Sequence, residues 1–110
     1  MSDKTEVVQG SGNVYADLGF EDPEMELNRA ELARQINALI EAQNLTQEAA
    51  AKVLGIDQPK VSAIRRGRLA GFSVERLMNL LARLDQNVRI TVEPKAASQA
   101  TGRVEVVAAR

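Results

Sequence analysis

The stretch LTQEAAAKVLGIDQPKVSAIRRG, residues 45–67, decides the fold. Thr46 can cap the alanine-rich run that follows it, and Gly55 stands where a left-handed residue ends a helix. Asp57 can cap a second run, whose first turn tolerates Pro59 because an N–H there would have no helical partner. The spacing predicts two short helices joined by a tight turn.

The second helix of this pair is predicted over about residues 58–66, a span that Gly67 would end. Its apolar positions, Val61 and Ile64, should face the first helix, and the small residues 49 and 50 would allow a close approach. Helical hairpins in general use alanine and glycine in this way, so an ordinary α-helical bundle remains an alternative.

Two longer helices are predicted on either side of the pair. Asp22 and Pro23 are typical of a helix start, and the first helix should continue to about Gln43. Ser73 can cap the other helix. Both carry apolar residues at helical spacing, Leu27, Leu32, Ile36, Leu39 and Ile40 in the first, and Val74, Leu77, Leu80, Leu81 and Leu84 in the second.

The composition of the 110 residues excludes several classes of protein. Without Cys or His, the chain has no disulfide, thiolate nucleophile, His/Cys metal site or histidine general base. It also has no glycine-rich phosphate loop. We therefore expect neither an enzyme nor a cofactor. No apolar run approaches the roughly 18 residues of a membrane span, and the polar start does not resemble a signal peptide, so we expect a soluble cytoplasmic protein.

The net charge of −1 hides an uneven distribution. Residues 1–28 carry one basic and seven acidic side chains, whereas the remainder carries 13 basic and eight acidic ones. From Gln58 to Val74 there is no acid, and the four cations in that span are Lys60, Arg65, Arg66 and Arg68. Most charge runs are only solvated faces. This one coincides with the second helix of the pair and therefore favours a nucleic-acid partner.

Residues 45–67 resemble the Xre/Cro-type helix-turn-helix of phage repressors and bacterial regulators. The resemblance rests on the joint spacing of Thr-Gln, Leu-Gly-Ile, Gln-Pro, Val-Ser and Arg-Gly, which makes an ordinary bundle a poor explanation. It implies an all-α, lambda-repressor-like bundle of four to five helices that binds double-stranded operator DNA.

Three further features are similar to the HigA-like antitoxin branch of these regulators. They are the run at residues 12–19, the Gly71-Phe72-Ser73 segment and an alternating C-terminal segment. The resemblance implies a repressor of its own operon that neutralises a RelE-like toxin. A stand-alone regulator without a toxin is the alternative, and so is a protein-interaction module that has kept the scaffold without binding DNA.

The residues that meet DNA are predicted from the helix geometry and from the resemblance. Gln58 projects from the N-terminal end of the recognition helix, where its amide can bond adenine in a bidentate fashion. Gln47 matches the phosphate clamp of the family. Simple solvation is the alternative for Arg65 and Arg66, and surface packing is the alternative for Ser62 and Ala63. The predicted DNA-binding set is Gln47, Gln58, Pro59, Lys60, Ser62, Ala63, Arg65, Arg66 and Arg68.

Residues 88–93 alternate strictly between apolar and polar types, which predicts one C-terminal β-strand. Val88, Ile90 and Val92 would turn towards the helices. Because a lone strand leaves its backbone groups unpaired, it should pair with the same strand of a second copy, with residues 13–20 or with a toxin strand. Pairing between two copies is favoured because operators read by such motifs are usually palindromic. We therefore expect a homodimer.

The domain organisation follows from these assignments. Residues 1–12 are predicted to be a disordered acidic N-terminus and residues 13–94 the DNA-binding domain with its strand. Residues 95–110, rich in Ala, Ser and Gly, are predicted to be a flexible tail.

Overall fold

A computed structural model of the chain describes residues 22–109. Within that range the chain forms the four predicted helices: α2 (Pro23–Ala42), α3 (Gln47–Leu54), α4 (Gln58–Arg65) and α5 (Val74–Arg83). None of these helices combines the length and the apolar character needed to cross a membrane. The predictions for residues 1–12 and 13–20 lie outside the described range.

Each helix begins where the sequence predicts. In every case the side chain of the expected N-cap residue accepts a hydrogen bond from a backbone N–H in the first turn. The four bonds are each 3.0 Å long and run to Asp22 from Glu24, to Thr46 from Ala49, to Asp57 from Lys60 and to Ser73 from Arg76. Local side-chain chemistry therefore fixes the helix starts.

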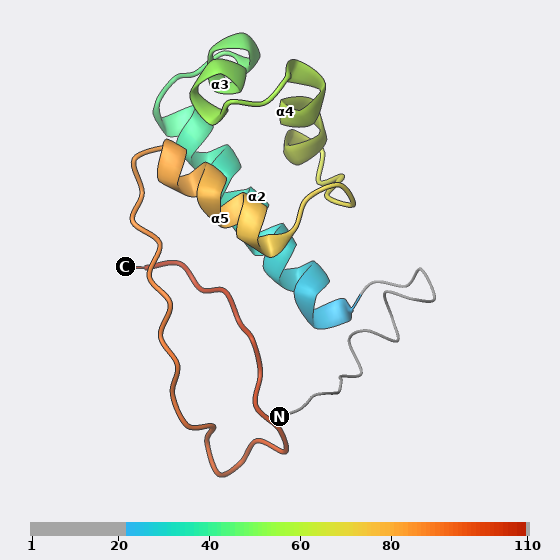
Figure 1. Cartoon of the computed structure of the whole chain (residues 1–110), viewed down its shortest axis with the longest axis vertical. Coiled ribbons are helices and arrows are strands. Elements are labelled where there is room, and N and C mark those ends of the chain that lie inside the picture. Colours follow the sequence, from blue (N-terminus) through green and yellow to red (C-terminus); the bar gives the residue numbers. More distant parts are fainter. Residues whose placement is uncertain (1–21, 110) are drawn as a thin grey trace.

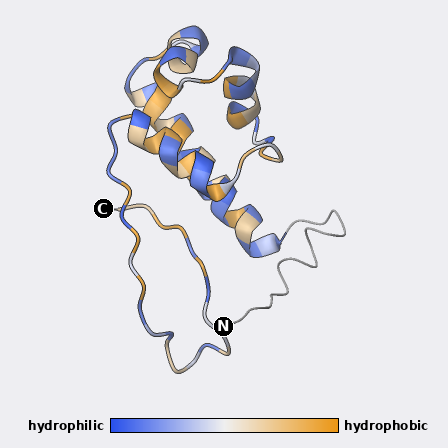
Figure 2. Ribbon diagram, in the orientation of Figure 1, coloured by the Kyte–Doolittle hydropathy of each residue, from blue (hydrophilic) through white to orange (hydrophobic). Residues whose placement is uncertain are grey.

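α2 and α5 pack against each other, and the α3–α4 pair packs on both (Figure 1). Each helix combines hydrophobic and hydrophilic residues (Figure 2), and its buried residues are apolar with the exception of Asn28. The buried apolar side chains form a single cluster made of Leu32, Ala33, Ile36, Ile40, Ala50, Ala51, Leu54, Val61, Ile64, Phe72, Leu77, Leu80, Leu81 and Leu84.

The turn between α3 and α4 depends on Gly55. Its φ of +71° lies in the left-handed region, and its N–H donates to the carbonyl of Ala51 at 2.9 Å. Ile56 follows it and packs partly buried against the core. The predicted helix end and turn are thus confirmed.

The predicted C-terminal strand is absent from the described part of the chain. Residues 88–93 form an irregular limb of a wide loop that leaves the helices after α5 (Figure 1). Val88, Ile90 and Val92 are 42%, 73% and 93% exposed, so the expectation that they cover the bundle is wrong. The physical reason is that no second strand within residues 22–109 accepts and donates the hydrogen bonds of a ladder.

The segment predicted as a flexible tail returns to α2. The carboxamide of Asn28 donates to the carbonyl of Val104 and accepts from the N–H of Val106, both at 2.9 Å. Asn28 is 4% exposed, whereas the neighbouring Leu27, which the apolar spacing placed on the inner side of α2, is 72% exposed. At this turn of the helix, contact with the tail decides which side is buried.

We expect Gly55→Ala to lower the free energy of unfolding by about 1–2 kcal/mol, because an L-residue is strained at this positive φ. The added Cβ would also lie 3.2 Å from Cζ of Arg83, at the flexible end of that side chain. Gly71→Ala is the matched control, since no heavy atom lies within 4 Å of its added Cβ and its φ is not in the left-handed region. Urea unfolding measures the free energy of unfolding of both variants. Equal losses in the two variants would contradict the assigned role of Gly55.

Candidate nucleic-acid interface

Helix α4 is held on the bundle from one side only. Val61 and Ile64 are fully buried beneath it. The amide of Asn37 on α2 also donates to the carbonyl of Ile64 at 3.2 Å, near the C-terminal end of α4. These contacts fix the orientation of the helix and leave its opposite face available to a partner.

The outward face of α4 is narrower than a helical wheel predicts. Gln58 and Pro59 at its N-terminal end are exposed, but Ser62 and Ala63 are only half-exposed. Ala63 packs against the hydrophobic core. The face is therefore most accessible at the N-terminal end, the part of a recognition helix that enters the major groove.

The structure brings the two predicted glutamines together. Gln47 is the first residue of α3, and its side-chain amide donates to the backbone carbonyl of Gln58, the first residue of α4, at 3.4 Å. The two helix starts therefore lie side by side. Helix starts present free N–H groups and the positive end of the helix dipole, which favours phosphate binding.

Two of the four predicted cations have partners within the protein. Nζ of Lys60 lies 3.7 Å from Oδ2 of Asp57. Nη2 of Arg65 lies 3.7 Å from Oε2 of Glu41, which is on α2. Because both pairs are largely exposed, each contributes little to stability. They do reduce the positive charge that these two side chains could offer to a phosphate group.

Arg66 and Arg68 differ from this first pair of cations. Both are exposed, and neither forms an ion pair with any carboxylate among residues 22–109. They flank Gly67, whose φ is +76°, and the N–H of Arg68 donates to the carbonyl of Ala63 at 2.8 Å. The turn after α4 thus places two unpaired guanidinium groups next to the recognition helix.

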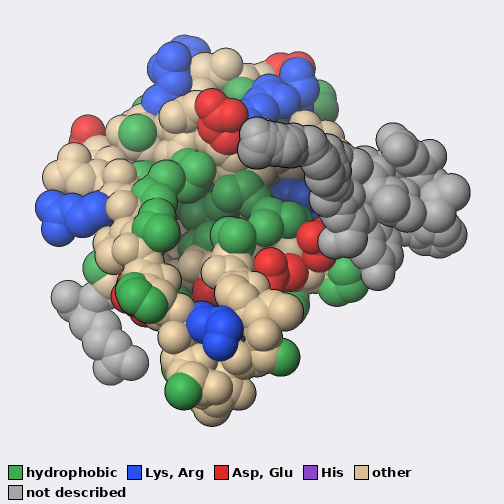
Figure 3. Space-filling view, turned by 60° about the horizontal axis from the view of Figure 1, so that its bottom comes forward, with side chains coloured by type: hydrophobic (Ala, Val, Ile, Leu, Met, Phe, Trp, Pro, Cys, Tyr) green, Lys and Arg blue, Asp and Glu red, His purple; other side chains and the backbone are tan. Residues whose placement is uncertain are grey.

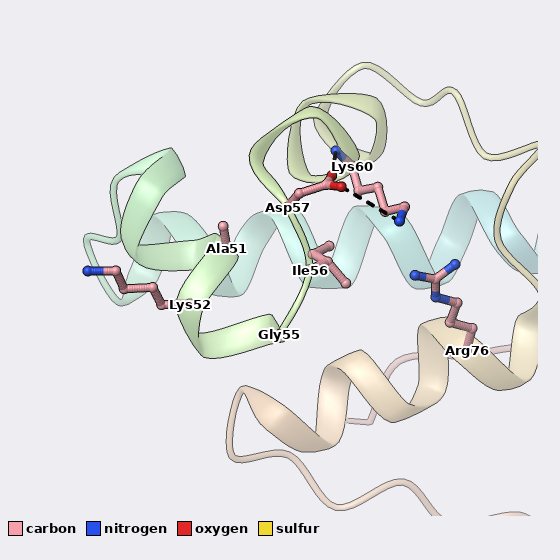
Figure 4. A pocket seen from close by; sticks show the side chains of 7 residues that line it. All are labelled: Ala51, Lys52, Gly55, Ile56, Asp57, Lys60 and Arg76. Atoms are coloured by element: carbon pink, nitrogen blue, oxygen red, sulfur yellow. Dashed lines mark hydrogen bonds and ion pairs between the residues drawn. The ribbon is translucent and has the colours of Figure 1, made fainter.

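Two basic residues that the sequence analysis did not identify share a cleft with Lys60. Lys52 of α3 and Arg76 of α5 line an open cleft beside the α3–α4 turn, together with Asp57 and Lys60 (Figure 4). Arg76 is held over the ring of Phe72, with Cζ 4.9 Å from the ring centroid. Neither residue falls within the acid-free span, and no local signal in the sequence predicts that α5 approaches this turn.

These features together define a class of protein. A short helix is fixed on a rigid bundle, its polar start is open, and guanidinium groups stand at its other end. No group of three or more His, Cys, Asp or Glu side chains within residues 22–109 could hold a metal ion. The arrangement is that of a helix-turn-helix DNA-binding domain.

Comparison with known proteins agrees with this class. A family model described as a helix-turn-helix domain matches residues 14–93, and the chain belongs to that family. A solved structure provisionally described as an XRE-family transcriptional regulator is 52% identical, with a TM-score of 0.74. The alignment covers 78% of this chain and 97% of the other. No curated protein gives a significant match. Membership of this family supports a role in DNA-binding transcription regulation.

The logarithm of the DNA-binding constant falls linearly with the logarithm of the salt concentration. We expect Arg66→Ala and Arg68→Ala each to make this slope less steep by about one, because each would remove one phosphate contact. Arg65→Ala should change it less, since Glu41 already neutralises this guanidinium. Fluorescence anisotropy at several salt concentrations measures the slopes. Equal slopes for all three variants would show that Arg65 leaves Glu41 when DNA binds.

Glu41→Gln provides the complementary measurement. It should tighten binding to every duplex at low salt, because it frees Arg65 and removes a negative charge near the interface. Glu26→Gln, which makes the same charge change in the first turn of α2, is the control. If Glu26→Gln tightened binding as much, only the net charge would matter, and the Arg65–Glu41 pair would have no specific role.

Proposed function

We propose that the chain is a homodimeric repressor that reads palindromic operator DNA through α4. The observation that carries this proposal is the open N-terminal end of α4, next to the start of α3 and followed by the unpaired Arg66 and Arg68. On this proposal, residues 13–94 are the DNA-binding unit, and the segments before and after it lie outside the DNA contact.

Roles within the interface follow from the chemistry of each residue. Gln58 reads a base, Pro59 makes apolar contact with a thymine methyl group, and the small Ala63 allows close approach. Ser62 offers a hydroxyl to either a base or a phosphate. The remaining residues of the predicted set bind phosphates and fix the register of the helix on the duplex, namely Gln47, Lys60, Arg65, Arg66 and Arg68.

Dimerisation is proposed through residues 88–93. Their alternation is typical of a strand, and their apolar side chains Val88, Ile90 and Val92 are exposed in the single chain. Pairing with a second copy would satisfy the backbone of both segments and bury these side chains. A two-fold axis would also match the symmetry of a palindromic operator.

We further propose an antitoxin role, in which the chain represses its own operon and neutralises a RelE-like toxin. The support is the resemblance of its sequence to HigA-like antitoxins, together with the exposed apolar C-terminal loop, which offers a surface for a partner. A stand-alone regulator is favoured by a different observation, since the solved relative is described only as a regulator. Co-purification with the product of the adjacent open reading frame supports the first role, and a neighbouring gene that encodes no small basic protein supports the second.

Gln58→Ala should weaken binding to the cognate operator by about 1–3 kcal/mol and leave binding to scrambled duplex almost unchanged. Gln99→Ala, in the C-terminal loop, is the control and should change binding to neither duplex. Titrations at one fixed salt concentration measure both duplexes. Equal losses on operator and scrambled DNA would show that Gln58 only positions the backbone, and that specificity comes from DNA shape or from other residues.

Ile90→Pro should convert the dimer to a monomer, because proline removes a ladder N–H from the pairing strand. Ala97→Pro is the matched control: it lies in the turn closed by the 3.0 Å bond from the Gln99 N–H to the Ala96 carbonyl, at a position where proline is tolerated. Sedimentation measures the oligomeric state. A dimer that survives Ile90→Pro would show that residues 88–93 do not form the interface.

A further inference from the structure

Asn28 is the one buried polar side chain among the described residues, and its partners lie 76 and 78 residues further along the chain. Its amide donates to the carbonyl of Val104, and its oxygen accepts from the N–H of Val106. Glu24, one turn earlier on α2, accepts from the N–H of Val104 at 3.3 Å. Three backbone groups of an extended segment are thus bound by two side chains of one helix.

These contacts form a small docking site for an extended chain. They bind the backbone of Val104 and Val106, while the side chain of Val106 packs partly buried against the core and those of Val104 and Val107 remain exposed. Nothing in the contacts requires that the docked segment come from the same molecule. Residues 104–106 of a second copy would satisfy Asn28 and Glu24 equally well.

The connection between α5 and the docked segment is long, and polar contacts do not fix it to the described helices. No hydrogen bond or ion pair joins residues 87–103 to the helices within the described range. These 17 residues could span on the order of 55 Å when extended, more than the 45 Å longest dimension of the protein. Figure 1 shows them as an open loop that leaves the bundle and returns to it. The docked segment can therefore reach α2 of another copy.

Apolar side chains are exposed on and around this loop. Five large apolar residues of the C-terminal loop are exposed, which are Val88, Ile90, Val92, Val104 and Val107. Seen from the side of the loop, hydrophobic side chains also gather at the centre of the face that it surrounds (Figure 3). Docking within one chain leaves these side chains uncovered, whereas an exchange of loops between two copies would place the two apolar loops together.

We propose that two copies exchange their C-terminal segments, so that Asn28 of each copy binds residues 104–106 of the other. This inference rests on the proposed homodimer and deepens it. The docking contacts are the same within one chain and between two, so they do not themselves favour exchange. The choice between docking within one chain and exchange is set by the pairing of residues 88–93, which the crossed loops would bring together. Exchange of an identical element is a low-cost route to a dimer.

Cysteine cross-linking tests the exchange, because the natural chain has no Cys. Leu27→Cys and Val104→Cys replace exposed side chains and leave the backbone contacts of the docking site in place. The two single variants are unfolded together, refolded and treated with a short bismaleimide. The inference predicts covalent dimers that contain one chain of each kind. Ala38→Cys, an exposed position farther along α2, is the control and should not link to Val104→Cys.

The double variant Leu27→Cys/Val104→Cys identifies the alternative arrangement. Refolded with an excess of the unsubstituted chain, an exchanged protein loses the Leu27–Val104 link, whereas a protein docked within one chain keeps it as an internal link. An internal link in a protein that sediments as a dimer would overturn the exchange and leave the homodimer intact. A monomer would overturn both, and operator titration would still test DNA binding separately.

Asn28→Ala provides an independent measurement. Because a single chain makes the same contacts, Asn28→Ala should change the dimer dissociation constant little. If the segments exchange, however, two copies separate only after residues 104–106 of one leave Asn28 of the other, so the loss of two hydrogen bonds at each site should raise the rate of subunit exchange by at least about tenfold. Asn79→Ala, an exposed asparagine on α5, is the matched control and should leave it unchanged. A rate of subunit exchange that Asn28→Ala does not change would show that the docked segment plays no part in the dimer.

Discussion

The burial of Val61 and Ile64 is the constraint on which the interface depends. Both side chains are completely enclosed, and they allow α4 only one orientation on the bundle. The bond from Asn37 to the carbonyl of Ile64 adds a polar contact at the far end of the helix. Because protein interiors are closely packed, rotating α4 would either open a cavity or force a clash. The position of Gln58 is therefore set by side chains on the opposite face of its own helix.

The electrostatics of the interface come from individual pairs and not from the net charge of −1. Lys60 and Arg65 each lie 3.7 Å from a carboxylate of the same chain. Exposed pairs of this kind are worth at most about 1 kcal/mol, so a phosphate group can compete for the same cation. Arg66 and Arg68 have no such competition among the described carboxylates. The surface beside α4 thus carries two kinds of cation: Arg66 and Arg68 are available, whereas Lys60 and Arg65 would have to leave a carboxylate before binding a phosphate.

Sequence reasoning succeeded where the determining interaction is local. The caps at Thr46, Asp57 and Ser73 bond to N–H groups three residues away, and such spacing is visible in the sequence. It missed the Arg65–Glu41 pair and the binding of Val104 by Asn28, which join residues far apart in the chain. Neither has a periodic signature, and each depends on how the helices pack. Leu27 was placed on the inner side of α2 for the same reason, because spacing alone does not show which turn of a helix lies beyond the core.

The alternation of apolar and polar residues at 88–93 differs from these cases, because it fits a contact that a single chain does not make. Val92 is 93% exposed in a segment whose pattern is typical of a half-buried strand. Two recognition helices that read one operator must stand about 34 Å apart, or a multiple of that distance. The C-terminal loop extends away from α4 (Figure 1), so a dimer formed by contact between the loops alone would place the two α4 helices at its opposite ends. Loops that cross and dock on the partner's α2 would bring the two bodies closer together, and the spacing of the operator is therefore the constraint that any dimer formed through residues 88–93 must meet.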